Sequence, residues 1–205
     1  MDRRNFLKGS LIAGPGVALL GTAEAGAQSS NEFGSDVDIL NFALIAEYFL
    51  SQFYREGGPQ MSGKESRYIE SIGADEDGHI AAITGTIQNL GGTPAQAPAI
   101  DFGKALASRK SFLEFAFKFE NLFAGAYLNA AGSIKSKEIL QAAAGIFGVE
   151  ERHAAIVGRL LGRSPTGGVY VGAFSKPVTK AATLKALKPY LKGAKAAAGG
   201  AAVTT

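Results

Sequence analysis

Four polar residues of this chain recur at a nearly constant interval, and the repeat constrains the fold more than any other feature. Glu47 and Tyr54 have counterparts 73 residues later, and Glu76 and His79 have counterparts 74 residues later. The later members are Glu120, Tyr127, Glu150 and His153. This duplication predicts two similar halves, related by an approximate two-fold axis that places the repeated residues symmetrically.

The repeated residues fall on four long segments with helical periodicity. We expect helices over 35–57, 62–90, 108–131 and 136–161. Apolar residues cover most of the circumference of the first segment, which predicts a helix buried on nearly all sides. The second segment opens with Ser62 and Glu65 at the spacing of a capping box.

The connections predict how these helices are arranged. Short loops join the first helix to the second and the third to the fourth, whereas residues 91–107 form a long Gly/Pro/Ala-rich connection. Seventeen extended residues span roughly 55 Å, enough to run the length of a bundle. The prediction is an all-α four-helix bundle over 35–162, with up-down, long crossover, down-up connectivity.

The C-terminal extension, 163–205, carries weaker signals. Residues 178–191 predict a short fifth helix, and the Ala/Gly-rich residues from 193 onward predict a disordered tail. Residues 169–171, Val-Tyr-Val, are the best candidate for a strand.

The N-terminus has the features of an export signal. Residues 2–8 read Asp-Arg-Arg-Asn-Phe-Leu-Lys, a short apolar run follows, and two Ala-x-Ala sites lie within residues 23–27. This pattern resembles a twin-arginine signal peptide. It predicts a signal over 1–27, a linker over 28–34, recognition by the twin-arginine export machinery, and a periplasmic or cell-envelope location.

Composition excludes several classes of protein. The absence of cysteine excludes disulfide scaffolds, zinc ribbons, Fe–S clusters and thiol catalysis. No stretch reaches the roughly 18 to 20 apolar residues of a membrane-spanning helix. The net charge of +3 is uneven, because residues 152–205 carry nine basic residues and no acidic ones. A basic tail on an acidic remainder is a poor pattern for a nucleic-acid-binding core, so no nucleic-acid partner is expected.

The repeated residues are suited to binding metal. Glu76 and His79, like Glu150 and His153, are three positions apart and therefore share one helix face. Glu47 and Glu120 lie within apolar helix segments, where a carboxylate must be paired, protonated or bound to metal.

Charge and donor type predict which ions these residues would hold. Four carboxylates neutralise two divalent cations, and carboxylate-rich ligation without thiolates favours Fe or Mn. Taken singly, each histidine is more typical of a structural helix residue than of a metal ligand, and each tyrosine is more typical of a core aromatic residue.

The same residues carry a resemblance to a known family. A Glu from each of two helices, with Glu-x-x-His from each of the other two, resembles the ligand set of the ferritin-like di-iron and di-manganese carboxylate proteins. The leader, the Phe-rich bundle and the Lys-Pro-containing extension are similar to exported bacterial ferritin-like proteins related to plant desiccation-related proteins.

The resemblance implies a role for each repeated residue. Glu47 and Glu120 would be terminal ligands of two Fe or two Mn ions, and Glu76 and Glu150 would bridge them. His79 and His153 would each bind one ion. The role of the tyrosines rests on spacing instead: Tyr54 and Tyr127 each share a helix face with the glutamate seven residues earlier and would hydrogen-bond to a ligand carboxylate.

Two functions remain open at this stage. One is an exported oxidoreductase acting on peroxide or dioxygen, with catalase-, peroxidase- or ferroxidase-like activity. The other is a non-catalytic metal-binding or structural protein of the envelope under desiccation stress. Without cysteine there is no rubredoxin-type electron donor. The sequence leaves homo-oligomerisation open, although the basic tail argues against a ferritin cage.

Overall fold

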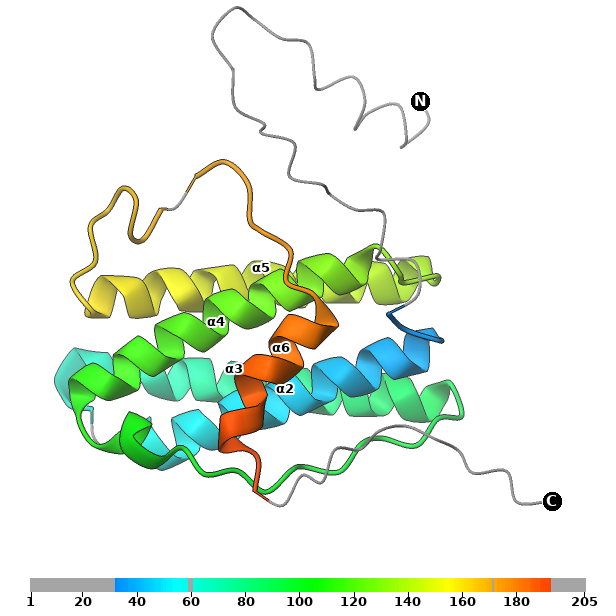
Figure 1. Ribbon diagram of the computed structural model, residues 1–205, viewed down its shortest axis with the longest axis horizontal. Helices are drawn as coiled ribbons and strands as arrows, with labels where there is room; N and C mark the ends of the chain where they lie inside the picture. The colour runs from blue at the N-terminus through cyan, green and yellow to red at the C-terminus, as the bar shows by residue number, and fades with distance from the viewer. Residues whose placement is uncertain (1–31, 59–60, 171, 193–205) are drawn as a thin grey trace, which may run out of the picture.

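A computed structural model describes residues 32–58, 61–170 and 172–192 (Figure 1). The described residues form an all-α fold of five α-helices with two short 3₁₀ turns, η3 and η4. The elements are α2 (Asp36–Gly57), α3 (Gly63–Asn89), η3 (Gly103–Leu106), α4 (Arg109–Ala131), α5 (Lys137–Leu160), α6 (Lys180–Leu187) and η4 (Lys188–Tyr190). None of the described helices is long and apolar enough to cross a membrane.

The four long helices form the predicted bundle. Helices α2 and α3 pack as one antiparallel pair and α4 and α5 as the other, and the long connection that joins the pairs runs back along the edge of the bundle (Figure 1). The helix directions are therefore up-down, crossover, down-up, which confirms the predicted fold class. The leader over 1–27, most of the 28–34 linker and the tail from 193 lie outside the described residues.

Serine side chains cap three of the four long helices. Ser35, Ser108 and Ser136 each accept a backbone N–H from the first turn of α2, α4 and α5 respectively. The capping box predicted at Ser62 and Glu65 is wrong, since the Ser62 side chain makes no capping bond.

The local geometry explains why that box does not form. Gly63 has a φ of 62°, so the first turn of α3 departs from the regular geometry that the box requires. Glu65 instead accepts hydrogen bonds from Nε and Nη2 of Arg109, at 2.7 and 2.6 Å.

The two ends of the bundle have cores of different composition. At one end, aromatic side chains from α2 and α4 form a cluster, in which the rings of Phe53 and Phe112 stack at 4.6 Å and those of Phe49 and Phe119 are tilted at 4.8 Å. At the other end, the core consists of smaller aliphatic side chains, among them Leu44, Ile83 and Ile139. The four buried glutamates and His153 lie between these two regions.

The C-terminal segment packs onto the bundle. Val178 donates its N–H to the carbonyl of Gly125 on α4, and a Cβ at position 125 would lie only 2.5 Å from the Val178 side chain. The ring of Tyr190 packs edge-on against Phe115 at 5.0 Å. The predicted fifth helix is thus present as α6 and η4, shorter than expected. The strand proposed at 169–171 is wrong: Val169 and Tyr170 donate to Ser164 and Pro165 in a turn, and residue 171 lies outside the described residues.

Candidate metal centre

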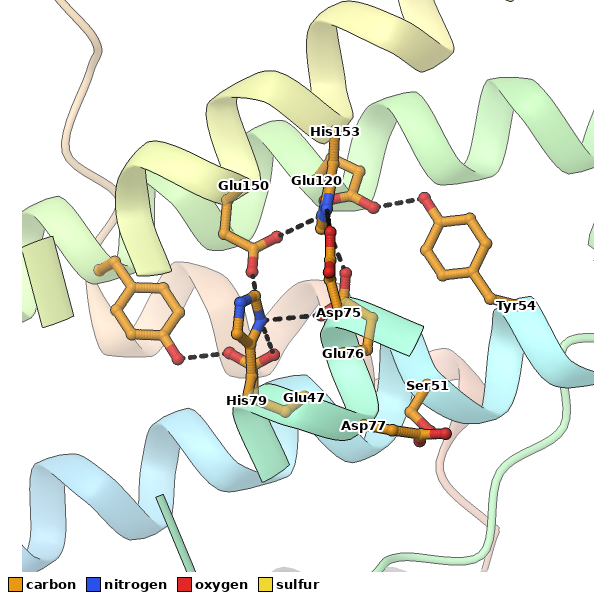
Figure 2. Close-up of polar contacts among 11 residues, drawn as sticks. Glu47, Ser51, Tyr54, Asp75, Glu76, Asp77, His79, Glu120, Glu150 and His153 are labelled. Carbon is orange, nitrogen blue, oxygen red and sulfur yellow. Dashed lines mark hydrogen bonds and ion pairs between the residues drawn. The ribbon is translucent and has the colours of Figure 1, made fainter. Parts of the chain in front are cut away.

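The six predicted ligands converge in the middle of the bundle (Figure 2). Helix α2 supplies Glu47, α3 supplies Glu76 and His79, α4 supplies Glu120, and α5 supplies Glu150 and His153. The four glutamates are at most 1% exposed and His153 is 2% exposed. The side chain of His79 is 12% exposed and is the most accessible of the six.

The donor atoms form two overlapping groups. Glu47, Glu76, His79 and Glu150 make one group, in which one donor atom from each residue lies within 4.8 Å of the others. The second group has the same spread and consists of Glu76, Glu120, Glu150 and His153. Glu76 and Glu150 belong to both groups, as expected of carboxylates placed between two ions.

Both histidines face the carboxylates through the same nitrogen. Nδ1 of His79 lies 3.1 Å from Glu47, 3.3 Å from Glu76 and 3.2 Å from Glu150. Nδ1 of His153 lies 3.0 Å from Glu76, 3.6 Å from Glu120 and 3.7 Å from Glu150. Each histidine therefore contacts both shared glutamates and the one outer glutamate of its own group.

Several of these buried atoms lack hydrogen bonds. The atoms are Oε1 of Glu76, Oε2 of Glu120, both carboxylate oxygens of Glu150, and Nδ1 of His153. A buried polar atom without a hydrogen bond is costly, and buried carboxylates are normally satisfied by donors or by a cation. Carboxylate oxygens and imidazole nitrogens are suitable ligands for divalent iron or manganese, so the residues fit such ions.

The electrostatics of the metal-free site are those of acids crowded together away from water. Burial, reinforced by the charge of Glu150, raises the pKa values of Glu47 and Glu120 well above their ordinary range. Burial alone would raise the pKa of Glu150 as well. Its contacts with His153 and His79 outweigh burial, so the pKa of Glu150 is lowered to about 2.

On the two histidines, burial and the neighbouring glutamates act in opposite directions, and the glutamates have the larger effect on the pKa. Burial lowers the pKa of His79, yet its contacts with the surrounding glutamates, Glu150 first, prevail and raise it to about 12. The pKa of His153 is raised for the same reason, with Glu120 as the leading partner. Without metal, the site therefore holds protons at neutral pH that bound cations would replace.

The two tyrosines bind the outer glutamates in a crossed pattern. Tyr54 donates its hydroxyl hydrogen to Glu120, and Tyr127 donates to Glu47. The sequence places each tyrosine on the same helix face as the glutamate seven residues before it, but each reaches the glutamate of the other half. Burial raises the pKa of both phenols, and the adjacent carboxylate raises it further, so both remain donors.

One contact to the site was missed from the sequence. Nε2 of His153 lies 3.1 Å from Oδ2 of Asp75, whose side chain is 56% exposed (Figure 2). A carboxylate in this position fixes the orientation of an imidazole and increases its basicity. By the repeat, the position equivalent to Asp75 is Val149, so the two halves differ here. No sequence spacing links Asp75 to His153, because they lie on different helices.

A second group of polar residues, Ser51, Arg55 and Asp77, lies beside the site. Ser51 is 3% exposed and donates to Asp77 at 2.6 Å, and Arg55 binds the same oxygen of Asp77 at 3.1 Å. These bonds join α2 to α3 beside the candidate metal centre.

The chain belongs to the family of proteins with a ferritin-like domain. Residues 35–163 match the model of that family, which is more than half of the chain and includes all six candidate ligands. Among solved structures, the chain is similar to a ferritin-like, diiron-carboxylate protein from Bacillus anthracis strain Ames, with 26% identity and a TM-score of 0.53. The similarity covers 61% of this chain and 94% of that one. A comparison with curated proteins finds no match.

Proposed function

We propose that this protein binds two iron or two manganese ions in its buried Glu/His cluster and uses them to reduce dioxygen or peroxide. The observation that carries this proposal is the set of buried oxygen and nitrogen atoms that face one another without hydrogen bonds. Two groups of four donors, sharing Glu76 and Glu150, match in number and type what a pair of ions would require.

Each residue then has a distinct part in holding the ions. Glu47 and Glu120 would each bind one ion from the outside, with Tyr127 and Tyr54 fixing their carboxylates. Glu76 and Glu150 would lie between the ions, and His79 and His153 would each bind one. When bound, such a pair of ions supplies the electrons that cleave an O–O bond.

The surrounding residues limit what the site does. The chain has no cysteine-ligated redox centre, so electrons for turnover would come from a separate donor. The aromatic cluster includes Tyr54, which contacts Glu120, so apolar side chains pack on that side of the site. The accessible edge of His79 leaves one side of the site open to a small molecule.

Metal content tests this proposal directly. Protein purified from its native cells should contain two equivalents of iron or manganese. Glu120→Gln should lower that content, whereas Glu114→Gln, an exposed glutamate of the same helix paired with Lys110, should not. Wild-type protein without bound metal would refute the proposal.

Turnover separates the catalytic function from the alternative. A metal-loaded protein that consumes hydrogen peroxide, or that oxidises ferrous iron with dioxygen, is an enzyme. Stoichiometric metal with no turnover of either oxidant would instead favour a metal-binding or structural protein of the envelope, of the kind expected under desiccation stress.

We also propose that the chain is exported after it has folded. The support is the twin-arginine pattern in residues 2–8. Cell fractionation should place the wild-type protein outside the cytoplasm, and replacing Arg3 and Arg4 together with lysine should retain it inside. Export that is unaffected by this double substitution would contradict the proposal.

A further inference from the structure

A cavity lies inside the bundle next to the candidate metal centre. Its volume is about 60 Å³, several times the roughly 10–15 Å³ that a single water-sized molecule requires. All four long helices line it, mainly with alanine, isoleucine and phenylalanine side chains, and no charged residue contributes to its wall.

The cavity follows the helix faces that carry the candidate ligands. Ala43 lies four residues before Glu47, and Ile146 lies four residues before Glu150, so each is one turn away on the same face. The wall also includes Tyr127, which donates its hydroxyl to Glu47. The cavity therefore ends at a residue that contacts a candidate ligand.

The amino-acid sequence explains why the space is left unfilled. The first half of α4 fills the aromatic end of the bundle with phenylalanine, whereas residues 124–131 of the same helix include four alanines and a glycine. Residues 142–145 of α5, on the facing helix, are Ala-Ala-Ala-Gly. Two residues of the wall, Ala82 on α3 and Ala142 on α5, are exposed.

The polar groups of the wall are already engaged. Thr86 donates its hydroxyl to the carbonyl of Ala82 at 2.8 Å, and Tyr127 donates to Glu47. No donor is left for water or hydrogen peroxide, each of which needs several polar partners in a buried site. An apolar cavity of this kind stays dry and accepts small apolar molecules.

We propose that this cavity is a binding site for dioxygen and delivers it to the metal centre, in preference to hydrogen peroxide. The proposal rests on the proposed function, because dioxygen has a use here only if the centre is loaded. It narrows the class of oxidant, which the ligand set alone leaves open.

Xenon is the probe, because it reports an apolar gas site without requiring metal or turnover. Crystals of the metal-free wild-type protein under xenon pressure should hold xenon in this cavity. Ala143→Phe, which fills the cavity from α5, should abolish xenon binding. Ala144→Phe is the matched control, since Ala144 is exposed and absent from the wall, and it should retain xenon.

The loaded protein provides the second measurement. Ala143→Phe should slow oxidation of bound ferrous iron by dioxygen by about tenfold or more, and leave oxidation by hydrogen peroxide within about twofold. Ala144→Phe should change neither rate. Melting curves verify that each variant is folded, and Ala143→Leu replaces the phenylalanine variant if that one does not fold.

The outcomes separate the two proposals. Absence of xenon from the wild-type cavity, or equal slowing with both oxidants, would overturn the dioxygen site even if the protein is fully loaded with metal. Xenon in the cavity of a protein that never binds metal would instead overturn the proposed function.

Discussion

The hydroxyl of Tyr54 donates to Glu120, 66 residues away and in the other half of the repeat. Tyr127 and Glu47 make the equivalent contact, 80 residues apart. Each helix pair therefore supplies the hydrogen bond that orients an outer carboxylate of the other pair. The two halves meet at the site through these bonds as well as through the shared glutamates.

Replacing either tyrosine with phenylalanine tests this arrangement. Tyr54→Phe keeps the ring that packs against Phe53 and Phe112 but removes the donor to Glu120. Metal affinity should fall by about 10- to 100-fold, the usual effect of removing a partner of a ligand. Tyr68→Phe is the control, because Tyr68 is 50% exposed. A metal titration that does not distinguish Tyr54→Phe from the control would contradict the assigned role.

Removal of Asp75 should affect one metal position more than the other. Asp75→Ala removes the carboxylate that contacts Nε2 of His153. The equivalent position in the other half is Val149, which offers His79 no carboxylate. We expect one of the two metal equivalents to bind about tenfold or more weakly, with the other little changed. Asp77→Ala is the neighbouring control, since Asp77 binds Ser51 and Arg55 instead. Stepwise titration monitored by calorimetry should resolve the two equivalents, and equal weakening of both would show that Asp75 does not act through His153.

The metal-free protein should lose stability as the pH rises above 6.5. The folded-state pKa of His79, about 12, exceeds its ordinary value of 6.5, so its contribution is complete below pH 6.5 and declines as the pH rises toward 12. Glu47 and Glu120, whose pKa values are also raised, change stability in the same direction. Glu150 does not oppose this trend, because its lowered pKa costs stability only below its ordinary value of 4.5. Melting temperatures between pH 6.5 and about 9 provide the measurement.

Metal uptake should release protons, because bound ions compete with the protons that the site holds. The apparent affinity for manganese should therefore increase over the same range of pH. Calorimetry in two buffers of different ionisation enthalpy counts the protons directly. Binding without proton release would mean that the histidines and outer glutamates are already deprotonated in the folded, metal-free protein.

Removing metal should lower the melting temperature, and one substitution should abolish the difference. A ligand at 100 times its Kd stabilises the folded state by about 2.7 kcal/mol. Glu120→Gln keeps the volume of the side chain but removes a ligand, so the variant should melt like metal-free wild-type protein whether or not metal is added. Glu114→Gln should retain the full metal-dependent rise. Loss of the rise in both variants would argue against a specific role for Glu120.

The convergence of the six candidate ligands was predictable because the relevant information is local or periodic. Glu76 and His79 share a face by their spacing alone, and the repeat relates them to Glu150 and His153. Glu47 and Glu120 are conspicuous as acids in apolar helices. The order of short and long connections was enough to predict how the four helices are joined.

Other features depend on geometry that no spacing encodes. Asp75 contacts His153 from another helix, and the crossed tyrosine pairing depends on how the two helix pairs are rotated against each other. Ser62 and Glu65 have the sequence of a capping box, but Arg109, far along the chain, competes for the carboxylate. The cavity is a property of the small side chains of four helices taken together.

The docking of the C-terminal segment has a consequence for how the chain is made. Asp101 donates its backbone N–H to Tyr190 and Lys192 donates to Ala99, so the crossover is held by residues near the end of the described chain. The ring of Tyr190 also covers Phe115. The crossover and the aromatic cluster therefore reach their final packing only after residues 178–192 have been synthesised and docked, so the bundle is completed late in the making of the chain.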